Sequence, residues 1–341
     1  MDPERVALIA SAKDWGYWKG AIKTRYDLWQ GKRLLDVGMG GGPHCVSFVE
    51  NGAQCYVGVD PLVGTDHVRD FRNNADKSLP AYHAFPFSPA DMMRIYPNAH
   101  LYPTILEKVP AEIRQHKCDI AIMDAVSEHL TQLEEVVRTI WELLEPHGLL
   151  WLCHCNYYSW TGHHREPRFV KDWRQDDPDH AKVVEWRHLE PDHADYSNSN
   201  FNRVRLEDLR LLIAKYFEIV EWRVSVDALA RLTPEIRARW KKYTLEELLG
   251  RNIYITGRRR DRPLDVDLSS RQFHHPAQDY QAERDFSGED IEPFALINSA
   301  YFSKTRELFS HGDNDNAAHR VFTRLKPGDT VTVRKFTHRL N

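Results

Sequence analysis

An apolar segment that ends in an acid and leads into a run of glycines constrains the fold of this chain more than any other feature. Residues 34–44 read LLDVGMGGGPH, and a second apolar segment, Tyr56–Val59, ends in Asp60. A strand, a glycine loop, a helix and a second strand in this order predict a nucleoside-binding βαβ unit, because glycines let the backbone approach a ligand closely. The acid after the second strand can then hold a ribose diol.

Two residues favour a sulfonium nucleoside over a dinucleotide. A dinucleotide fingerprint that starts at Gly38 needs a small residue at position 43, where Pro43 stands. Pro43 instead suits the first turn of a helix, where its missing N–H costs nothing. The Asp36 carboxylate would repel a pyrophosphate, but it can accept hydrogen bonds from a ligand ammonium group. The alternative, a purely structural glycine-rich turn, is disfavoured by the strand–loop–helix–strand context.

The pattern D-x-G-x-G-x-G at residues 36–42 resembles motif I of the class I S-adenosylmethionine-dependent methyltransferases. The segment Cys118–Leu130 resembles the fourth-strand motif of the same family, with matches at Asp119, Val126, Glu128, His129 and Leu130. The resemblance covers about residues 31–257. It implies an α/β fold, with a Rossmann-like, seven-stranded, mostly parallel sheet that carries helices on both faces.

The same resemblance implies S-adenosyl-L-methionine as cofactor and assigns residues to it. Glycines and the acid of motif I would hold the methionine part, Asp60 the ribose hydroxyls and Asp91 the adenine amino group. The backbone after the fourth strand would flank the sulfonium. The expected cofactor-binding residues are Asp36, Gly38, Gly40, Gly42, Asp60, Asp91, Asp124 and Ala125.

Periodicity and turn residues divide the chain into three parts. Residues 1–30 are expected to form an N-terminal helical cap. Residues 31–257 are expected to form the methyltransferase domain, with insertions at about 61–117 and 156–204. Residues 258–341 read as a linker followed by a small β-rich extension, with a strand at Thr330–Val333. The third strand of the domain is expected near Tyr82–Phe87.

Composition and termini exclude several classes of protein. The formal net charge of −4 argues against a protein built mainly to hold nucleic acid. Five cysteines without a C-x-x-C pair predict reduced thiols and no zinc motif. No apolar run approaches the roughly 20 residues of a membrane span, and the N-terminus is no signal peptide. We therefore expect a soluble, cytoplasmic protein without a membrane span, and a homo-oligomer is compatible with the sequence.

The segment after the fifth strand, His154–Arg165, mixes histidines, aromatic residues and an arginine, which suits a loop that binds the methyl acceptor. A hydroxyl acceptor needs a base with a pKa near neutrality, and histidine meets that need. The base candidates are His163, His164, His129 and His154. The expected substrate-binding residues are Asn156, Tyr157, Tyr158, Trp160 and Arg165. The alternative is a solvated loop whose aromatic residues pack on the core.

A metal is considered but not favoured. His163, His164, Asp192 and His193 could meet in space, and a divalent ion could activate a diol, but their spacing matches no known ligand pattern. No metal ligands are therefore assigned.

The sequence favours a methyltransferase that acts on a small-molecule or carbohydrate acceptor, at oxygen. One alternative is a non-catalytic module that binds the cofactor and assembles with a partner. Another is an RNA or protein methyltransferase. The absence of an N/D-P-P-Y/F motif after the fourth strand, where Asp124–Ser127 stands, and the lack of a basic face disfavour it.

Overall fold

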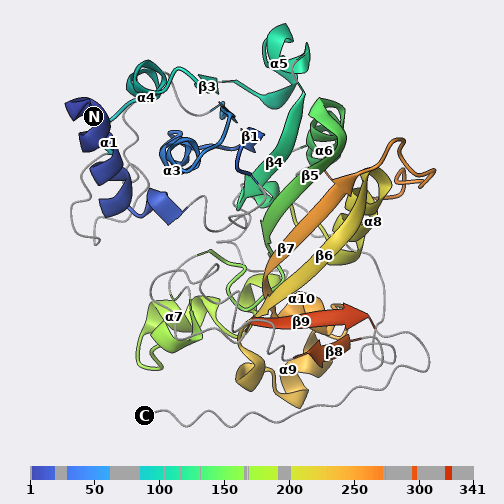
Figure 1. The fold of residues 1–341 in the computed structure, drawn as a ribbon. Coiled ribbons are helices and arrows are strands. Elements are labelled where there is room, and N and C mark those ends of the chain that lie inside the picture. Colours follow the sequence, from blue (N-terminus) through green and yellow to red (C-terminus); the bar gives the residue numbers. More distant parts are fainter. Residues whose placement is uncertain are drawn as a thin grey trace.

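The computed structural model describes residues 2–19, 29–61, 85–271 and 273, 294–297 and 319–324, with gaps at 103, 116, 131, 165, 166, 168 and 191–200. Its strands form one sheet in the order β3-β2-β1-β4-β5-β7-β6-β9-β8 (Figure 1). The strands are β1 Arg33–Val37, β2 Cys55–Val59, β3 Ala99–Tyr102, β4 Cys118–Asp124, β5 Leu144–Cys155, β6 Phe217–Val226, β7 Gly250–Arg259, β8 Phe294–Ile297 and β9 His319–Arg324.

The strand pairing gives the predicted Rossmann-like sheet. Strands β3, β2, β1, β4 and β5 are parallel neighbours, and β7 runs antiparallel to both β5 and β6. The seven-stranded, mostly parallel sheet is therefore confirmed. Beyond it, β9 pairs with β6 and β8 pairs with β9, both antiparallel. The predicted strand at 330–333 lies outside the described residues, and the predicted domain boundaries stay predictions.

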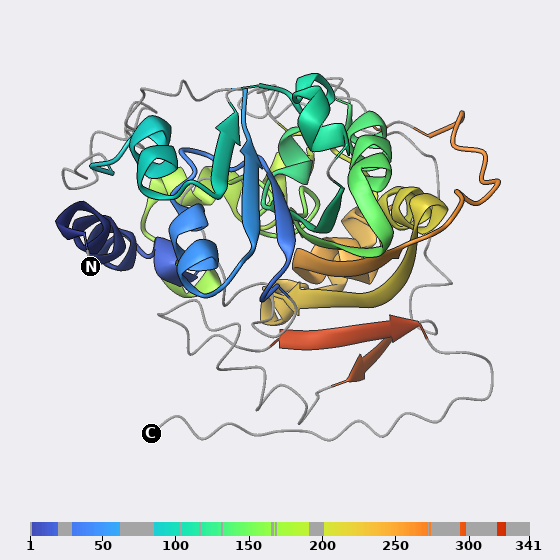
Figure 2. The ribbon, with the colours of Figure 1, turned by 45° about the horizontal axis from the view of Figure 1, so that its top comes forward.

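Helices cover both faces of the sheet (Figure 2). They are α1 Pro3–Asp14, α3 His44–Glu50, α4 Pro89–Ile95, α5 Ala111–Gln115, α6 Leu133–Leu143, α7 Pro178–Val183, α8 Leu206–Tyr216, α9 Pro234–Arg239 and α10 Leu245–Leu249. Short 3₁₀ turns include η1 Tyr17–Lys19, η2 Leu106–Lys108, η3 Ser127–His129, η4 Val170–Asp172, η5 Arg187–Leu189 and η7 Leu229–Arg231. Among the described residues, none of the helices has the length and apolar character needed to cross a bilayer.

Alternation along the strands separates two cores, one on each face of the sheet. Leu35, Val57 and Leu150 face the core that α6 and α8 cover, whereas Leu34, Tyr56 and Ile120 face the core that α1, α3 and α4 cover. Strands buried on both faces read as continuous apolar runs, which is why β1 and β5 could be recognised in the sequence.

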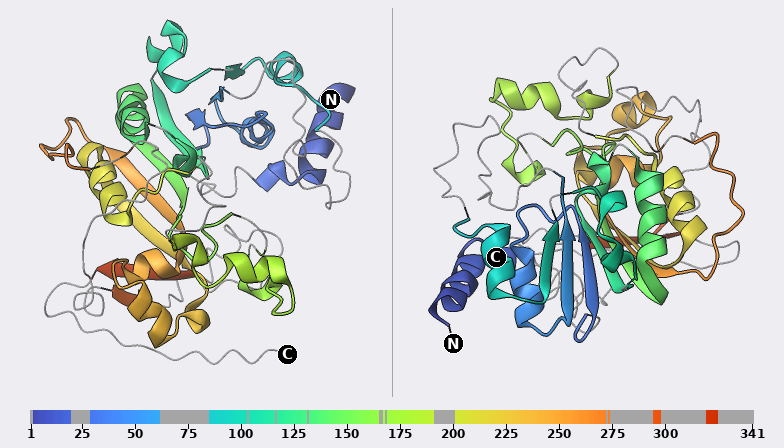
Figure 3. Two further views of the ribbon diagram at one scale, coloured as in Figure 1. Left: turned by 180° about the vertical axis from the view of Figure 1, so that it is seen from behind. Right: turned by 90° about the horizontal axis from the view of Figure 1, so that it is seen from above.

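A third apolar cluster lies beyond the carboxyl ends of β4 and β5, where α7, α9 and α10 gather (Figures 1 and 3). It contains Tyr158, Trp160, Trp186, Tyr243 and Leu248. This small core gives the segment after β5 its own support, so that the segment is anchored at the end of the sheet where a ligand would bind.

The predicted third strand was placed wrongly. Residues 85–88 are irregular, Ser88 caps α4, and β3 is Ala99–Tyr102. The part of the predicted strand at 82–84 lies outside the described residues. Only four residues long and flanked by Pro97 and Pro103 in the sequence, β3 carries little sequence signal; its place is fixed by pairing with β2.

Candidate active site

The glycine turn, residues 38–42, begins directly where β1 ends. The Gly38 N–H donates to the Val59 carbonyl at 2.8 Å, which holds the turn against the end of β2. Gly38, Gly40 and Gly42 all have positive φ values, of 75°, 60° and 81°. Residues with a Cβ are disfavoured at these backbone angles, which accounts for glycine at all three positions.

Asp60 joins this turn from the end of β2. Its carboxylate accepts a hydrogen bond from the Gly40 N–H, with 2.9 Å between Gly40 N and Asp60 Oδ2. The structure thus brings together the glycines and the acid that the sequence predicted to share a site.

Asp36 lies beneath the turn and is 5% exposed. It accepts a hydrogen bond from the Tyr56 hydroxyl on the neighbouring strand. Burial, together with the Asp36 charge, raises the pKa of Tyr56 well above its ordinary value, so the phenol stays a proton donor. Asp36 is therefore fixed in orientation under the loop, which sequence reasoning did not foresee.

Asp91 has a different place from the one predicted. It precedes β3 rather than following it, and its carboxylate accepts hydrogen bonds from the N–H and hydroxyl of Ser88 in a capping box at the start of α4. The backbone and hydroxyl hydrogen bonds from Ser88 lower the pKa of Asp91. The structure supports the helix-capping role of this acid, and the premise that it follows the third strand was wrong.

A pocket of about 250 Å³ opens at the carboxyl ends of β4 and β5, beside the start of β7. Its lining consists mostly of polar and ionisable side chains. The lining residues are Ala125, Glu128, His129, Cys155, Asn156, Ser159, Thr161, His164, Arg251 and Asn252. The pocket collects residues from three parts of the chain, because the antiparallel β7 returns its first residues to the end of β5.

The pocket and the glycine turn are joined by the residues that follow β4. Ala125 lines the pocket, and its N–H donates to the Cys153 carbonyl at 2.9 Å. The next residue, Val126, packs on the turn so closely that a Cβ on Gly38 would stand 2.6 Å from Val126 Cγ1. Ala125 therefore lies between the glycine turn and the pocket, and the assignment of Asp124 and Ala125 to the cofactor stays a prediction.

Glu128 is the most unusual side chain of the pocket. It is 2% exposed, and neither carboxyl oxygen accepts a hydrogen bond from the part of the chain that the structure describes. Burial raises the pKa of this carboxyl. His129 Nε2 lies 3.9 Å from Glu128 Oε1, which is too long for a hydrogen bond but close enough for a favourable charge interaction.

Two of the predicted base candidates line the pocket and two do not. His129 and His164 are lining residues with ring centroids 6.1 Å apart. His163 is 2% exposed and packs against Trp160 and His188 instead.

His154 is 1% exposed, and its Nδ1 lies 2.9 Å from Ser127 Oγ. Burial lowers the pKa of His154 to about 3, so it stays neutral near pH 7 and is a poor base. The structure therefore argues against His163 and His154 as bases.

Most of the predicted substrate-binding residues pack into an apolar cluster instead of lining the pocket. Tyr157, Tyr158 and Trp160 belong to the third apolar cluster and do not line the pocket. Asn156 lines it, but its side-chain amide donates to the carbonyls of Glu247 and Gly250, each at 2.7 Å. The packing alternative thus holds for the aromatic residues, and Arg165 lies outside the described residues.

Sequence reasoning missed several pocket residues. Glu128 matches the family motif without a role assigned to it, and Cys155 is assigned none beyond that of a reduced thiol. Ser159, Thr161, Arg251 and Asn252 were not assigned, since nothing local in the sequence shows that β7 returns to the end of β5. The proposed metal group of His163, His164, Asp192 and His193 cannot be examined as a set, because Asp192 and His193 lie outside the described residues.

Comparison with known protein families identifies a match to one of them. A sequence model described as a methyltransferase domain matches residues 18–208. No curated protein matches the chain.

Among solved structures, the chain resembles a protein described as an S-adenosylmethionine-dependent methyltransferase from Listeria monocytogenes. The TM-score is 0.41 and the identity 16%, over 73% of this chain and 100% of that one. It also resembles an S-adenosylmethionine-dependent methyltransferase from Mesorhizobium loti, with a TM-score of 0.41 and 18% identity, over 74% and 100% of the two chains. At these TM-scores neither likeness bears on function. The sequence match spans more than half of the chain, including the glycine turn, Asp60 and the residues after β4, and the chain therefore belongs to the methyltransferase-domain family.

Proposed function

We propose that this protein transfers a methyl group from S-adenosyl-L-methionine to an oxygen atom of a small-molecule or carbohydrate acceptor. The observation that carries the proposal is the contact between Val126 and Gly38, which sets the glycine turn next to a polar pocket through the short segment Ala125–Val126. A methyl transfer needs a donor site and an acceptor site that share a wall, because donor and acceptor must approach in line.

The residues at the glycine turn fit the proposed cofactor. Gly38, Gly40 and Gly42 carry no side chains of their own, and Asp60 stands at the turn with a carboxylate that can accept from two ribose hydroxyls. When bound, S-adenosyl-L-methionine would supply an activated methyl group on a sulfonium. The chain itself then has to bind the donor and the acceptor, orient them toward one another and exclude water.

The pocket fits a small, polar acceptor. At about 250 Å³ it lies just below the usual size of small-molecule sites, which start at roughly 300 Å³. Its serine, threonine, asparagine and arginine side chains offer both donors and acceptors of hydrogen bonds. Together with the net charge of −4, this disfavours a nucleic-acid acceptor.

His129 is the base that the geometry favours for an acceptor hydroxyl. It lines the pocket, and the carboxyl of Glu128 lies 3.9 Å from its Nε2, where it can stabilise the imidazolium formed on proton uptake. This role revises the ranking from sequence, which placed His163 and His164 first.

Calorimetry with S-adenosyl-L-methionine and its demethylated product tests the cofactor. We expect wild type to bind both and Asp60→Ala to lose at least about tenfold in affinity, since a ribose-holding carboxylate is worth roughly 1.5–3 kcal/mol. Asp179→Ala, at an exposed position on α7, is the folded control. Heat from NAD but none from the sulfonium donor would overturn the proposal.

Turnover is tested with donor labelled in the methyl group and a panel of hydroxylated acceptors. His129→Gln should lower kcat roughly 100-fold or more, the usual effect of losing a general base, while donor affinity stays unchanged. His147→Gln, at an exposed position near the start of β5, is the matched control. Donor binding without transfer to any member of a broad panel would instead favour the non-catalytic module.

A further inference from the structure

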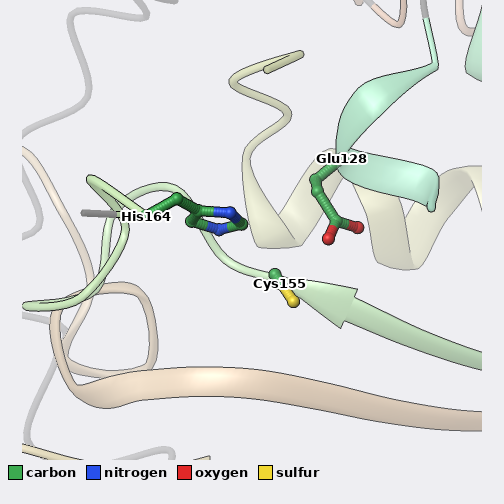
Figure 4. A group of neighbouring side chains, drawn as sticks. All are labelled: Glu128, Cys155 and His164. Carbon is green, nitrogen blue, oxygen red and sulfur yellow. The ribbon is translucent and has the colours of Figure 1, made fainter. Parts of the chain in front are cut away.

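Three side chains with different donor atoms meet in the pocket: the carboxyl of Glu128, the thiol of Cys155 and the imidazole of His164. One potential ligand atom from each lies within 4.8 Å of the other two. Figure 4 shows the imidazole of His164 and the carboxyl of Glu128 directed toward one another, with Cys155 at the tip of β5. They come from η3, from the last residue of β5 and from the following turn, so the fold rather than local sequence brings them together.

The buried carboxyl of Glu128 points to a missing positive partner. A carboxyl that is 2% exposed and accepts no hydrogen bond of standard geometry from the described residues, with the thiol and N–H of Cys155 close by, costs free energy unless a proton or a cation satisfies it. His129 Nε2 lies 3.9 Å from Glu128 Oε1, and the His129 side chain is 44% exposed, so His129 stabilises the buried carboxylate only in part.

We propose that Glu128, Cys155 and His164 bind a thiophilic divalent cation, of which Zn²⁺ is the type, on the acceptor side of the pocket. A thiolate and an imidazole select Zn²⁺ over Mg²⁺ or Ca²⁺, which prefer oxygen ligands. Three protein ligands, one of them a carboxylate, are the number found in catalytic zinc sites, where the fourth position stays open.

Small side-chain movements complete the geometry. Metal–ligand distances of about 2.0–2.3 Å place tetrahedral ligand atoms roughly 3.5 Å apart, against the 4.8 Å limit that this group meets. Cys155 and His164 are both only partly buried, and the proposed site needs their side-chain bonds to rotate so that the ligand atoms move inward. Binding the ion releases the thiol proton of Cys155 to solvent.

The open position would face the pocket, where an acceptor hydroxyl or thiol can occupy it. This deepens the proposed function, on which it rests, because it restricts the acceptor to groups that coordinate a zinc-like ion. An acceptor without such a group, or a planar nitrogen in a large base, fits this site less well.

Cobalt is the probe for the test, since a Co²⁺–thiolate bond gives a charge-transfer absorption that Zn²⁺ lacks. Full-length protein is freed of metal by a chelator and titrated with Co²⁺. We expect one ion per chain, a thiolate charge-transfer band, loss of the band on addition of Zn²⁺, and no competition from Mg²⁺.

Variants assign the ligands. Cys155→Ser should abolish the charge-transfer band, and Glu128→Gln and His164→Gln should each weaken binding about tenfold or more. Cys55→Ser, a partly buried thiol at the start of β2, is the matched control and should keep the band. Circular dichroism confirms that each variant folds.

Absence of the band in wild type, or its persistence in Cys155→Ser, would overturn the metal site. Binding of S-adenosyl-L-methionine to the metal-free protein is measured separately, so that failure of the metal site leaves the cofactor result intact. Conversely, a protein that binds Co²⁺ but no sulfonium donor would keep the site and refute the proposed reaction.

Discussion

The glycine turn and the pocket, the two halves of the proposed site, are built in different ways. At the turn, backbone geometry dominates: three glycines with positive φ, a carbonyl of β2 and the carboxylate of Asp60 fix the shape. At the pocket, side chains from η3, the turn after β5 and the start of β7 supply the surface, and a separate apolar cluster holds them. The first half depends on local sequence and the second on long-range packing.

On the pocket side, removal of one member of a buried ion pair should therefore cause the largest loss in the free energy of unfolding. Arg205 and Glu247 form a two-point ion pair, with 2.7 Å between Arg205 Nη2 and Glu247 Oε2, and their side chains are 4% and 2% exposed. Glu247 also offers its carbonyl to Asn156. Arg205→Met strands the carboxylate and should lower the free energy of unfolding by about 3–5 kcal/mol in urea titrations.

The matched control for this ion pair is Arg258→Met, which breaks the exposed pair with Glu218. Its expected cost is below about 1 kcal/mol. Similar losses in the two variants would show that the pocket does not depend on the buried pair.

On the side of the glycine turn, a methyl group added to a glycine should cause the largest loss in the free energy of unfolding. Gly38→Ala places a Cβ 2.6 Å from Val126 Cγ1 at a φ of 75°. Backbone strain and steric overlap together should lower the free energy of unfolding by about 3 kcal/mol, which urea titration measures. Donor affinity, measured by calorimetry, should fall with it.

Gly31→Ala separates strain from overlap, because Gly31 has a φ of 67° but an added Cβ there would have no other atom within 4 Å. It should cost only about 1 kcal/mol. If both alanine variants lose the same free energy, close packing of the turn against Val126 is not what shapes it.

The last effect concerns the loss of stability in acid, which should arise on the pocket side. Burial is the main cause that holds the pKa of His154 at about 3, with the charges of His164 and His129 adding to it. A folded-state pKa below the unfolded value near 6.5 contributes stability that is present above about pH 6.5 and is lost as pH falls toward 3.

In the presence of a chelator, the free energy of unfolding of the wild-type protein should thus fall by up to about 1.4 kcal/mol for each pH unit of acidification in this range, through His154. His154→Gln should remove that part of the slope in unfolding titrations from pH 7 to 4. Burial raises the pKa of Glu128, so this residue contributes to the pH slope with the opposite sign. Because it does so in both proteins, its contribution cancels from the difference between the two slopes. An unchanged slope in the variant would contradict the assignment.

The contrast between the two halves also explains what the sequence could predict. Strand β1, the glycine turn and Asp60 are encoded within 28 residues by an apolar run, glycines and an acid, each with a local physical meaning.

The pocket was less predictable because its residues reveal their roles only after folding. Tyr158 and Trp160 look like a ligand-binding surface in the sequence, yet they pack under α10 and against Tyr243 in their own small core. Glu128 looks like a motif residue, and only its burial without a hydrogen-bonding donor in the described chain marks it out. Residue type predicts chemistry, but exposure depends on contacts between distant segments.

The packing of Val126 on Gly38 has a kinetic consequence. Val126 packs on Gly38 and its neighbour Ala125 lines the pocket, so a donor bound at the glycine turn would contact a segment that also forms part of the pocket wall. We expect the acceptor to be held more tightly once the donor is seated, and turnover to proceed through an ordered sequence in which the donor enters first.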